Sequence, residues 1–175
     1  MVAARRPSST RAATRRAALV LALAGAALLG ACSGRDPAPQ FSYTLLDGQK
    51  ASTEAQRGKV LLVNFWATSC VTCVAEMPQI VDTHRKFAPR GYETLAVAMQ
   101  YDPPAYVANF AESRRLPFGV VIDNTGAIAN AHGPVTLTPT TFLIDKRGRI
   151  VKRYVGTPDF PALHALVEKL LAETA

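Results

Sequence analysis

Two cysteines separated by two residues, Cys70 and Cys73, are the side chains whose type and spacing best suit chemistry. An apolar run typical of a buried strand, residues 60–66, precedes them, and a run compatible with a helix, residues 71–87, begins directly after Cys70. Cys70 is therefore expected at a helix N-terminus, where free N–H groups and the helix dipole favour a thiolate. Cys73 falls one turn further along the same face, close enough for a disulfide. The spacing predicts a redox-active dithiol, with Cys70 as nucleophile and no bound cofactor.

A zinc site is the main alternative for such a pair, and two inert buried thiols are another. Zinc normally takes three or four protein ligands. The sequence has no second Cys-x-x-Cys pair, and none of its three histidines, His84, His132 and His164, is spaced as a ligand pair. The sequence therefore favours redox chemistry and predicts no metal site.

The net charge of +7 at first suggests a nucleic-acid partner, but its distribution argues against one. Five basic residues and no acidic residue precede Cys32, and the fifteen basic and thirteen acidic residues that follow leave only +2. No basic patch interleaved with aromatic residues occurs in that remainder. Nucleic-acid binding is not expected.

The N-terminus has the pattern of an export signal. After an arginine-rich start, the thirteen apolar residues 17–29 are too few for a transmembrane helix but suit the core of a signal peptide. The next residues complete Leu29-Gly30-Ala31-Cys32, which resembles the bacterial lipobox, in which the cysteine is lipidated and becomes the first mature residue. An ordinary cleavage site and an uncleaved anchor remain alternatives.

These features predict three segments: a lipoprotein signal peptide over residues 1–31, a flexible tether over residues 32–40 and one domain over residues 41–175. With Cys32 lipidated, the only thiols left would be the Cys-x-x-Cys pair, which suits an extracytoplasmic redox protein. We expect the domain on the periplasmic side of the bacterial cell envelope, held to a membrane by lipid.

The elements expected in the domain are those of an α/β fold. Residues 41–52 suggest a hairpin turned at Asp47-Gly48, covering one edge of a sheet. Buried strands over residues 60–66 and 94–99, separated by a helix, imply parallel pairing. Asp102 is expected to cap the helix that follows. Beyond it we expect a strand over 118–122, a short helix over 127–132, a hairpin of 141–145 and 149–155, and a final helix from Asp159.

Two segments together carry a family resemblance: Trp66-Ala67-Thr68-Ser69-Cys70-Val71-Thr72-Cys73, and the later run from Leu137 through Thr138-Pro139 to Asp145. With the strand and helix they resemble the thioredoxin superfamily. Asn64 to Thr68, Glu76-Met77-Pro78 and a strand–helix insert at 94–115 resemble its TlpA/ResA-like thiol-disulfide oxidoreductases. This resemblance implies a thioredoxin-like fold: a central mixed sheet flanked by helices, with an N-terminal β-hairpin and the insert.

The resemblance also implies roles for residues outside the cysteine pair. Thr138-Pro139 matches the cis-proline loop that lies against the cysteines, where the backbone of Thr138 would pair with a bound peptide. The residues alone would make Pro139 an ordinary proline at the start of a strand. Trp66 is expected to pack beside the disulfide and is counted with these two residues as a substrate contact. His132 could reach the site, but the sequence favours a structural histidine at a helix end.

Glu76 is the candidate proton-transfer residue. It lies three residues after Cys73 and so on the same helical face, where partial burial would raise its pKa and let it accept or return a proton. Asn64 stands where thioredoxin itself has a buried aspartate, which leaves Glu76 as the acid for this role. A solvated helix glutamate is the alternative.

The function implied is that of a membrane-anchored enzyme that reduces disulfides in exported proteins, for cytochrome c or copper-site maturation. A membrane thiol electron donor would reduce it again. A thioredoxin-fold copper chaperone using both cysteines and a histidine is the rival, although such chaperones usually have three residues between the cysteines. A peroxiredoxin is disfavoured, because no proline lies between Gln40 and Cys70.

Overall fold

The computed structural model describes residues 34–175. The expected signal peptide and the lipidation residue Cys32 lie outside the described residues. Within the described part of the chain, no helix is both long enough and apolar enough to span a membrane.

A five-stranded mixed sheet forms the centre of the domain, in the order β5-β4-β3-β6-β7. The central strand β3 runs parallel to β4 and antiparallel to β6. Every residue of β3 is buried, which explains its nearly continuous apolar sequence. The strand bounds are Val60–Trp66 for β3, Tyr92–Ala98 for β4, Gly119–Ile122 for β5, Thr140–Ile144 for β6 and Ile150–Val155 for β7.

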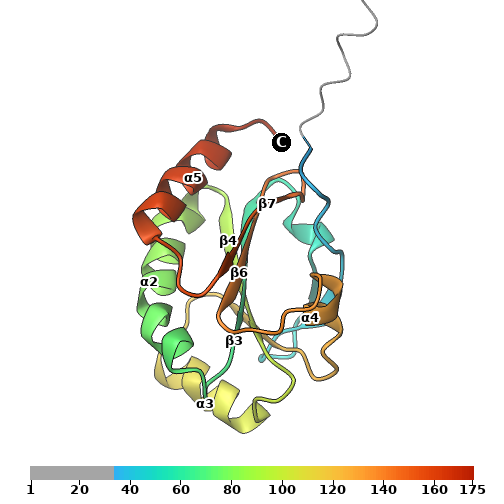
Figure 1. Cartoon of the computed structure of the whole chain (residues 1–175), viewed down its shortest axis with the longest axis vertical. Coiled ribbons are helices and arrows are strands. Elements are labelled where there is room, and N and C mark those ends of the chain that lie inside the picture. The colour runs from blue at the N-terminus through green and yellow to red at the C-terminus, as the bar shows by residue number, and fades with distance from the viewer. Residues whose placement is uncertain (1–33) are drawn as a thin grey trace, which may run out of the picture. The chain divides into compact units, whose positions relative to one another are not determined.

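Helices cover both faces of this sheet. Helices α2, α3 and α5 lie on one face, and α4 lies on the other (Figure 1). Alternate residues of β3 supply the two cores: Leu62 and Trp66 pack under the three helices, and Val63 and Phe65 pack on the opposite side. The helix bounds are Val71–Phe87 for α2, Pro104–Ser113 for α3, Ala127–Ala131 for α4 and Phe160–Ala172 for α5, with short 3-10 turns at Glu54–Gln56 and Ala88–Arg90.

The expected N-terminal hairpin is present. Strands β1 (Ser42–Thr44) and β2 (Lys50–Ser52) pair antiparallel around the turn at Asp47-Gly48. Leu45 bridges Val121 of β5, so the hairpin protects this edge strand as predicted.

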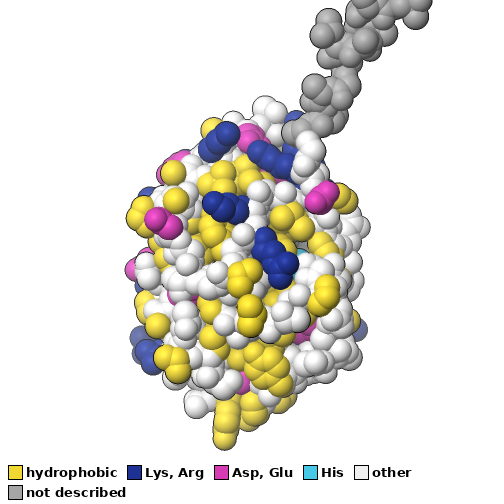
Figure 2. Space-filling view, viewed as in Figure 1, with side chains coloured by type: hydrophobic (Ala, Val, Ile, Leu, Met, Phe, Trp, Pro, Cys, Tyr) yellow, Lys and Arg dark blue, Asp and Glu magenta, His cyan; other side chains and the backbone are white. Residues whose placement is uncertain are grey.

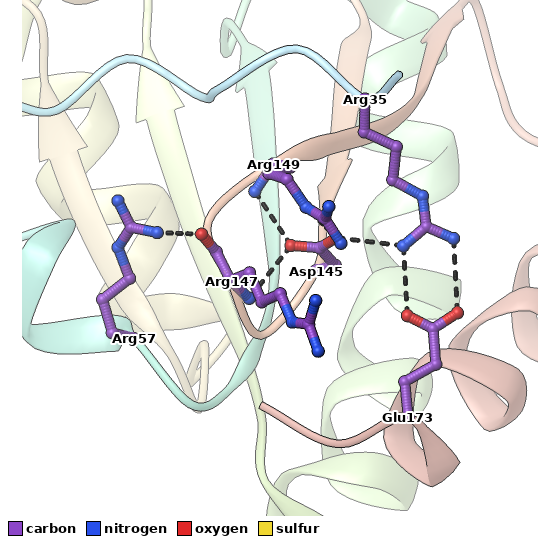
Figure 3. A network of polar contacts seen from close by, with 6 residues as sticks. All are labelled: Arg35, Arg57, Asp145, Arg147, Arg149 and Glu173. Atoms are coloured by element: carbon purple, nitrogen blue, oxygen red, sulfur yellow. Dashed lines mark hydrogen bonds and ion pairs between the residues drawn. The ribbon is translucent and has the colours of Figure 1, made fainter. Parts of the chain in front are cut away.

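Residues 35–40 correct the predicted flexible tether, because they lie along the domain. The amide of Ala38 donates to the carbonyl of Gly148, and the amide of Ile150 donates to the carbonyl of Asp36. The guanidinium of Arg35 contacts Asp145 at 2.9 Å and Glu173 at 3.0 Å (Figure 3). The proline-rich sequence lacks the periodicity of a strand, but its backbone groups still find partners on the β6–β7 turn.

The predicted cap of α3 is also wrong. The N-cap position belongs to Pro103, and no side chain caps this helix. If Asp102 were the cap, Pro104 would occupy the second helical position, where it offers no N–H to a capping side chain. The carboxylate of Asp102 turns instead toward Thr68, in the loop before the cysteines.

Candidate active site

The two cysteines form a disulfide at the start of α2, as their spacing predicted. Cys70 is the N-cap residue, and its sulfur accepts a hydrogen bond from the amide of Cys73 at 3.2 Å. Cys70 is half-buried, whereas Cys73 is fully buried and Val71 between them is 84% exposed. The sulfur of Cys70 is therefore the one closer to solvent and to the positive end of the helix.

Trp66 lies at the end of β3, immediately before this loop. It is fully buried and packs against the ring of Phe110, with 5.0 Å between ring centroids. The expectation that it belongs to the core is confirmed. Its proposed substrate contact is wrong, because the side chain has no exposed surface for a partner to touch.

The Thr138–Pro139 peptide bond is cis, as the resemblance implied. The next residue, Thr140, is paired with Phe65 in the antiparallel register of β6 and β3. Pro139 consequently lies beside Trp66, at the end of the sheet from which the cysteine loop emerges. The two motifs, 66 residues apart in sequence at Cys73 and Pro139, reach the same end of the sheet.

Glu76 is buried beneath this site, with 1% of its surface exposed. The side-chain amide of Asn64 donates to its carboxylate at 3.1 Å and to the hydroxyl of Thr141 at 2.9 Å. Burial raises the pKa of Glu76 to about 6, although the hydrogen bond from Asn64 and the nearby hydroxyl of Thr157 act in the opposite direction. The alternative of a solvated helix glutamate is therefore excluded by its position.

His132 does not join this site. Its Nδ1 lies 2.8 Å from the carbonyl oxygen of Ile128, and its ring packs against Phe65 and Phe142 in the core on the α4 side. Burial lowers its pKa, so the neutral ring is favoured. Among residues 34–175 there is also no cluster of three or more His, Cys, Asp or Glu side chains arranged to hold a metal ion.

Sequence reasoning missed the roles of two residues near the site. Asp102 bonds to the loop before Cys70, and Tyr101 contacts the hydroxyl of Thr138. Both join segments more than 30 residues apart. The only available signal was the charge of Asp102 directly before two prolines, and it suggested a helix cap.

A disulfide at a helix start, a cis-proline loop at the same end of the sheet and a thioredoxin-like fold define the class of thiol-disulfide oxidoreductases. Comparison with known proteins leads to the same class. Residues 34–167 match the family described as Redoxin. Thiol-disulfide oxidoreductase ResA of Geobacillus thermodenitrificans is 40% identical over 120 residues, which cover 69% of this chain and 68% of the relative.

Solved structures agree. A protein from Neisseria meningitidis described as a thioredoxin is 39% identical, with a TM-score of 0.72 over 77% of this chain and 90% of that one. A thiol:disulfide interchange protein of Chlorobium tepidum is 28% identical, with a TM-score of 0.73 over 81% of this chain and 100% of that one. The chain belongs to the Redoxin family, as a TlpA/ResA-like member of the thioredoxin superfamily with thiol-disulfide oxidoreductase activity.

Proposed function

We propose that this enzyme works outside the cytoplasm, anchored to a membrane, and reduces disulfides in exported proteins. The observation that carries the proposal is the Cys70–Cys73 disulfide above a buried acid, in a chain whose sequence begins with an export pattern. Cytochrome c maturation and copper-site maturation are the substrate classes that the family resemblance favours. A membrane thiol donor would regenerate the dithiol.

The cysteines divide the reaction into two exchanges. The thiolate of Cys70 attacks one sulfur of the substrate disulfide, forms a mixed disulfide and releases the other substrate sulfur as a thiolate. Cys73 then loses its proton and attacks Cys70, which frees the second substrate thiolate and leaves the Cys70–Cys73 disulfide. Two electrons pass from enzyme to substrate. The two substrate thiolates take up protons, one released by Cys73 and one from solvent.

Glu76 would assist the second exchange. Cys73 is buried, so its thiol needs a nearby group to take its proton, and Glu76 lies one helical turn further along the same face. A pKa of about 6 leaves the carboxylate mostly ionised at neutral pH and able to accept that proton. Asn64, which bonds to the same carboxylate, has no acidic proton to exchange. Thr138 and Pro139 would align the substrate peptide beside Cys70.

The reduction potential of the Cys70–Cys73 couple tests the direction of this proposal. For a two-electron couple, 30 mV corresponds to about 1.4 kcal/mol, so the potential decides which partner is reduced. We expect a reducing value of about −300 mV, measured by equilibration against dithiothreitol buffers. A value of about −120 mV would make the protein an oxidant and contradict the proposal.

The membrane anchor is tested separately by Cys32→Ala. We expect this substitution to release the protein from membranes in cell fractionation, while the redox domain keeps its activity. Intact-mass measurement of the native protein provides the second readout. A mature N-terminus without lipid, or one that begins at any residue other than Cys32, would contradict the anchor.

A further inference from the structure

The loop between β4 and α3 contacts both of the loops at the active-site end of the sheet. Asp102 accepts hydrogen bonds from the backbone amide of Thr68 at 2.6 Å and from the hydroxyl of Thr68 at 2.5 Å. The neighbouring residue Tyr101 places its hydroxyl 3.3 Å from that of Thr138. Two adjacent residues of one loop thus hold the cysteine loop on one side and the cis-proline loop on the other.

The contact made by Asp102 is built into the fold. Its residue is only 3% exposed, and each of its carboxylate oxygens accepts one bond from Thr68. A buried carboxylate is unfavourable unless its oxygens are paired, and bonds to a charged acceptor are the strong ones. Backbone hydrogen bonds join the same two segments: the amide of Met99 donates to the carbonyl of Trp66 at 3.0 Å, and the amide of Asp102 donates to the carbonyl of Met99 at 2.9 Å.

The same contact holds the turn that presents the nucleophile. The amide of Cys70 donates to the carbonyl of Ala67 at 3.1 Å, so residues 67–70 form a four-residue turn with Thr68 at its second position. Fixing Thr68 therefore fixes the turn that places Cys70 at the N-cap of α2.

Tyr101 differs from Asp102 because the residue is 58% exposed while its hydroxyl reaches Thr138. Leu137, next to Thr138, is 63% exposed, and Val71, next to Cys70, is 84% exposed. Hydrophobic side chains also gather at the lower end of the face drawn in Figure 2, the end at which α2 begins in Figure 1. An incoming peptide would therefore meet an apolar rim that includes Tyr101.

We propose that the β4–α3 loop is a positioning element of the active site, which we call the bracket loop (residues 99–103). Asp102 positions the turn that carries Cys70, and Tyr101 positions Thr138 for the substrate backbone. This inference rests on the proposed disulfide exchange at Cys70 and adds two residues that act on it through others. It gives the strand–helix insert a role in catalysis.

The first test is a double-mutant cycle of Asp102→Asn and Thr68→Val in the full-length protein. Asparagine keeps the shape of Asp102 but accepts at only one oxygen, and valine removes only the hydroxyl of Thr68. We expect Asp102→Asn to lower kcat/KM for insulin disulfide reduction about tenfold, because small displacements of reacting groups have large effects. In the Thr68→Val background the same change should have a smaller effect, since the contact is already weakened.

Asp123→Asn is the matched control, because Asp123 is also 3% exposed and accepts two backbone bonds, but at the start of α4 on the opposite side of the sheet. Asp123→Asn should leave kcat/KM nearly unchanged in folded protein.

The pH dependence of Cys70 alkylation distinguishes an effect of Asp102 on the position of Cys70 from an effect of its charge. If Asp102→Asn only displaces the alkylation curve along the pH axis and leaves kcat/KM unchanged, Asp102 acts by its charge alone and the proposal is wrong. The proposal is also wrong if the effects of Asp102→Asn and Thr68→Val on kcat/KM simply multiply in the double mutant, because the two residues would then act independently.

The second test is Tyr101→Phe, with Tyr106→Phe as control because Tyr106 is similarly exposed, at 64%. Loss of one hydrogen bond should raise KM for insulin about threefold and leave the reaction with a small aromatic disulfide unchanged. Equal behaviour of the two variants would overturn the role of Tyr101. If the unsubstituted protein itself failed to reduce insulin, the proposed function would be wrong. If it reduced insulin and the substitutions at Asp102 and Tyr101 had no effect on the reaction, only the role of the bracket loop would be refuted.

Discussion

Glu76 shows how one buried side chain adjusts the chemistry of a disulfide. The carboxylate accepts a bond from Asn64, which also bonds to Thr141, so the acid is held in a fixed place within the core. Burial raises its pKa to about 6, within the range where a group can both take and return a proton near neutral pH. Its charge also opposes a thiolate nearby, so the titrations of acid and thiols should be coupled.

Glu76→Gln tests this role, because it keeps the shape of the side chain and removes its charge. We expect slower disulfide reduction near neutral pH, since the proton acceptor is lost, and a lower apparent pKa of the thiols, since the repulsion is lost. The measurement is the alkylation rate of the reduced protein as a function of pH, together with turnover. Superimposable curves with unchanged turnover would show that Glu76 has no part in the reaction.

The same substitution should change how stability depends on pH. The pKa of Glu76 is higher in the folded protein than its ordinary 4.5, so its contribution is fully present below about pH 4.5 and is lost as the pH rises through about 6. The shift corresponds to about 2 kcal/mol. Relative to the unsubstituted oxidised protein, Glu76→Gln should therefore gain about this amount between pH 4.5 and pH 7.5 in urea unfolding.

The exposed Glu112, on α3, provides the control for this measurement as Glu112→Gln. Its unfolding free energy should follow that of the unsubstituted protein across the same pH range. A constant difference between Glu76→Gln and the unsubstituted protein would contradict the raised pKa.

At the scale of elements, the N-cap and the buried face of α5 are formed by residues close to one another in the sequence. The helix was expected to start at Asp159, and this residue is its N-cap: its carboxylate accepts from the amide of Ala162 at 2.9 Å. Beyond the cap, Leu163, Val167 and Leu170 are buried on one face, the i, i+4, i+7 pattern of a helix packed on a sheet.

Asp159→Ala should destabilise the domain by about 1 kcal/mol, because the first turn of α5 loses a satisfied amide. Asp159→Ser supplies another capping oxygen and should lose only a few tenths of a kcal/mol. Urea unfolding at pH 7 measures both. Equal losses for alanine and serine would show that the cap contributes nothing measurable.

At the scale of the whole domain, the two ends of the central sheet carry different groups of residues. Asp145 directly follows β6, and Leu61, near the start of β3, pairs with Ile144. Trp66 lies at the other end of β3, about 20 Å away for a strand of this length. The contacts of Arg35 with Asp145 therefore lie at one end of the sheet, while the disulfide lies at the opposite end (Figure 1).

The contacts at the Arg35 end hold residues from three parts of the chain together (Figure 3). Burial raises the pKa of Asp145, but bonds from Arg149 and Arg35 outweigh it, so the net pKa is lowered. A carboxyl with a lowered pKa contributes stability that is present above its ordinary pKa of 3.8 and is lost as the pH falls below it. Arg35 also joins this acid to Glu173 near the C-terminus.

Arg35→Met should destabilise the domain by about 1–2 kcal/mol at pH 7, because bonds to charged partners are lost at a half-buried position. The loss should shrink as the pH falls below 3.8 toward the lowered pKa at which Asp145 becomes protonated in the folded protein. Arg90→Met is the matched control: Arg90 also makes a two-bond contact with a glutamate, Glu168, but on the exposed surface. Its effect should be smaller. If Arg35→Met and Arg90→Met lose the same unfolding free energy at pH 7, the contacts of Arg35 contribute no more than an exposed ion pair.

Much of this architecture could be predicted from the sequence, because hydrophobic periodicity and turn residues act locally. The strands, the hairpin at Asp47-Gly48, the capped final helix and the Cys70–Cys73 disulfide follow from residues near each other in the chain. The burial of Glu76 also followed from helical spacing. The family resemblance supplied the cis bond at Pro139, since the residues alone favoured trans.

What could not be predicted depends on partners distant in sequence. The turn of Asp102 toward Thr68 requires knowing that β4 lies beside β3, and the same placement brings Tyr101 to Thr138. Residues 35–40 carry no strand pattern, and their binding to the domain depends on free backbone groups of the β6–β7 turn. The complete burial of Trp66 depends on α3, which supplies Phe110.

The most direct test of the whole account is which cysteine traps a substrate. Reduced Cys73→Ser and Cys70→Ser proteins would each be mixed with a disulfide-bonded peptide, quenched with acid and measured by intact mass. We predict that Cys73→Ser accumulates a covalent peptide adduct on Cys70, because the resolving thiol is missing, and that Cys70→Ser accumulates almost none. An equal adduct on Cys70→Ser, or none on Cys73→Ser, would contradict the assignment of Cys70 as the attacking thiol.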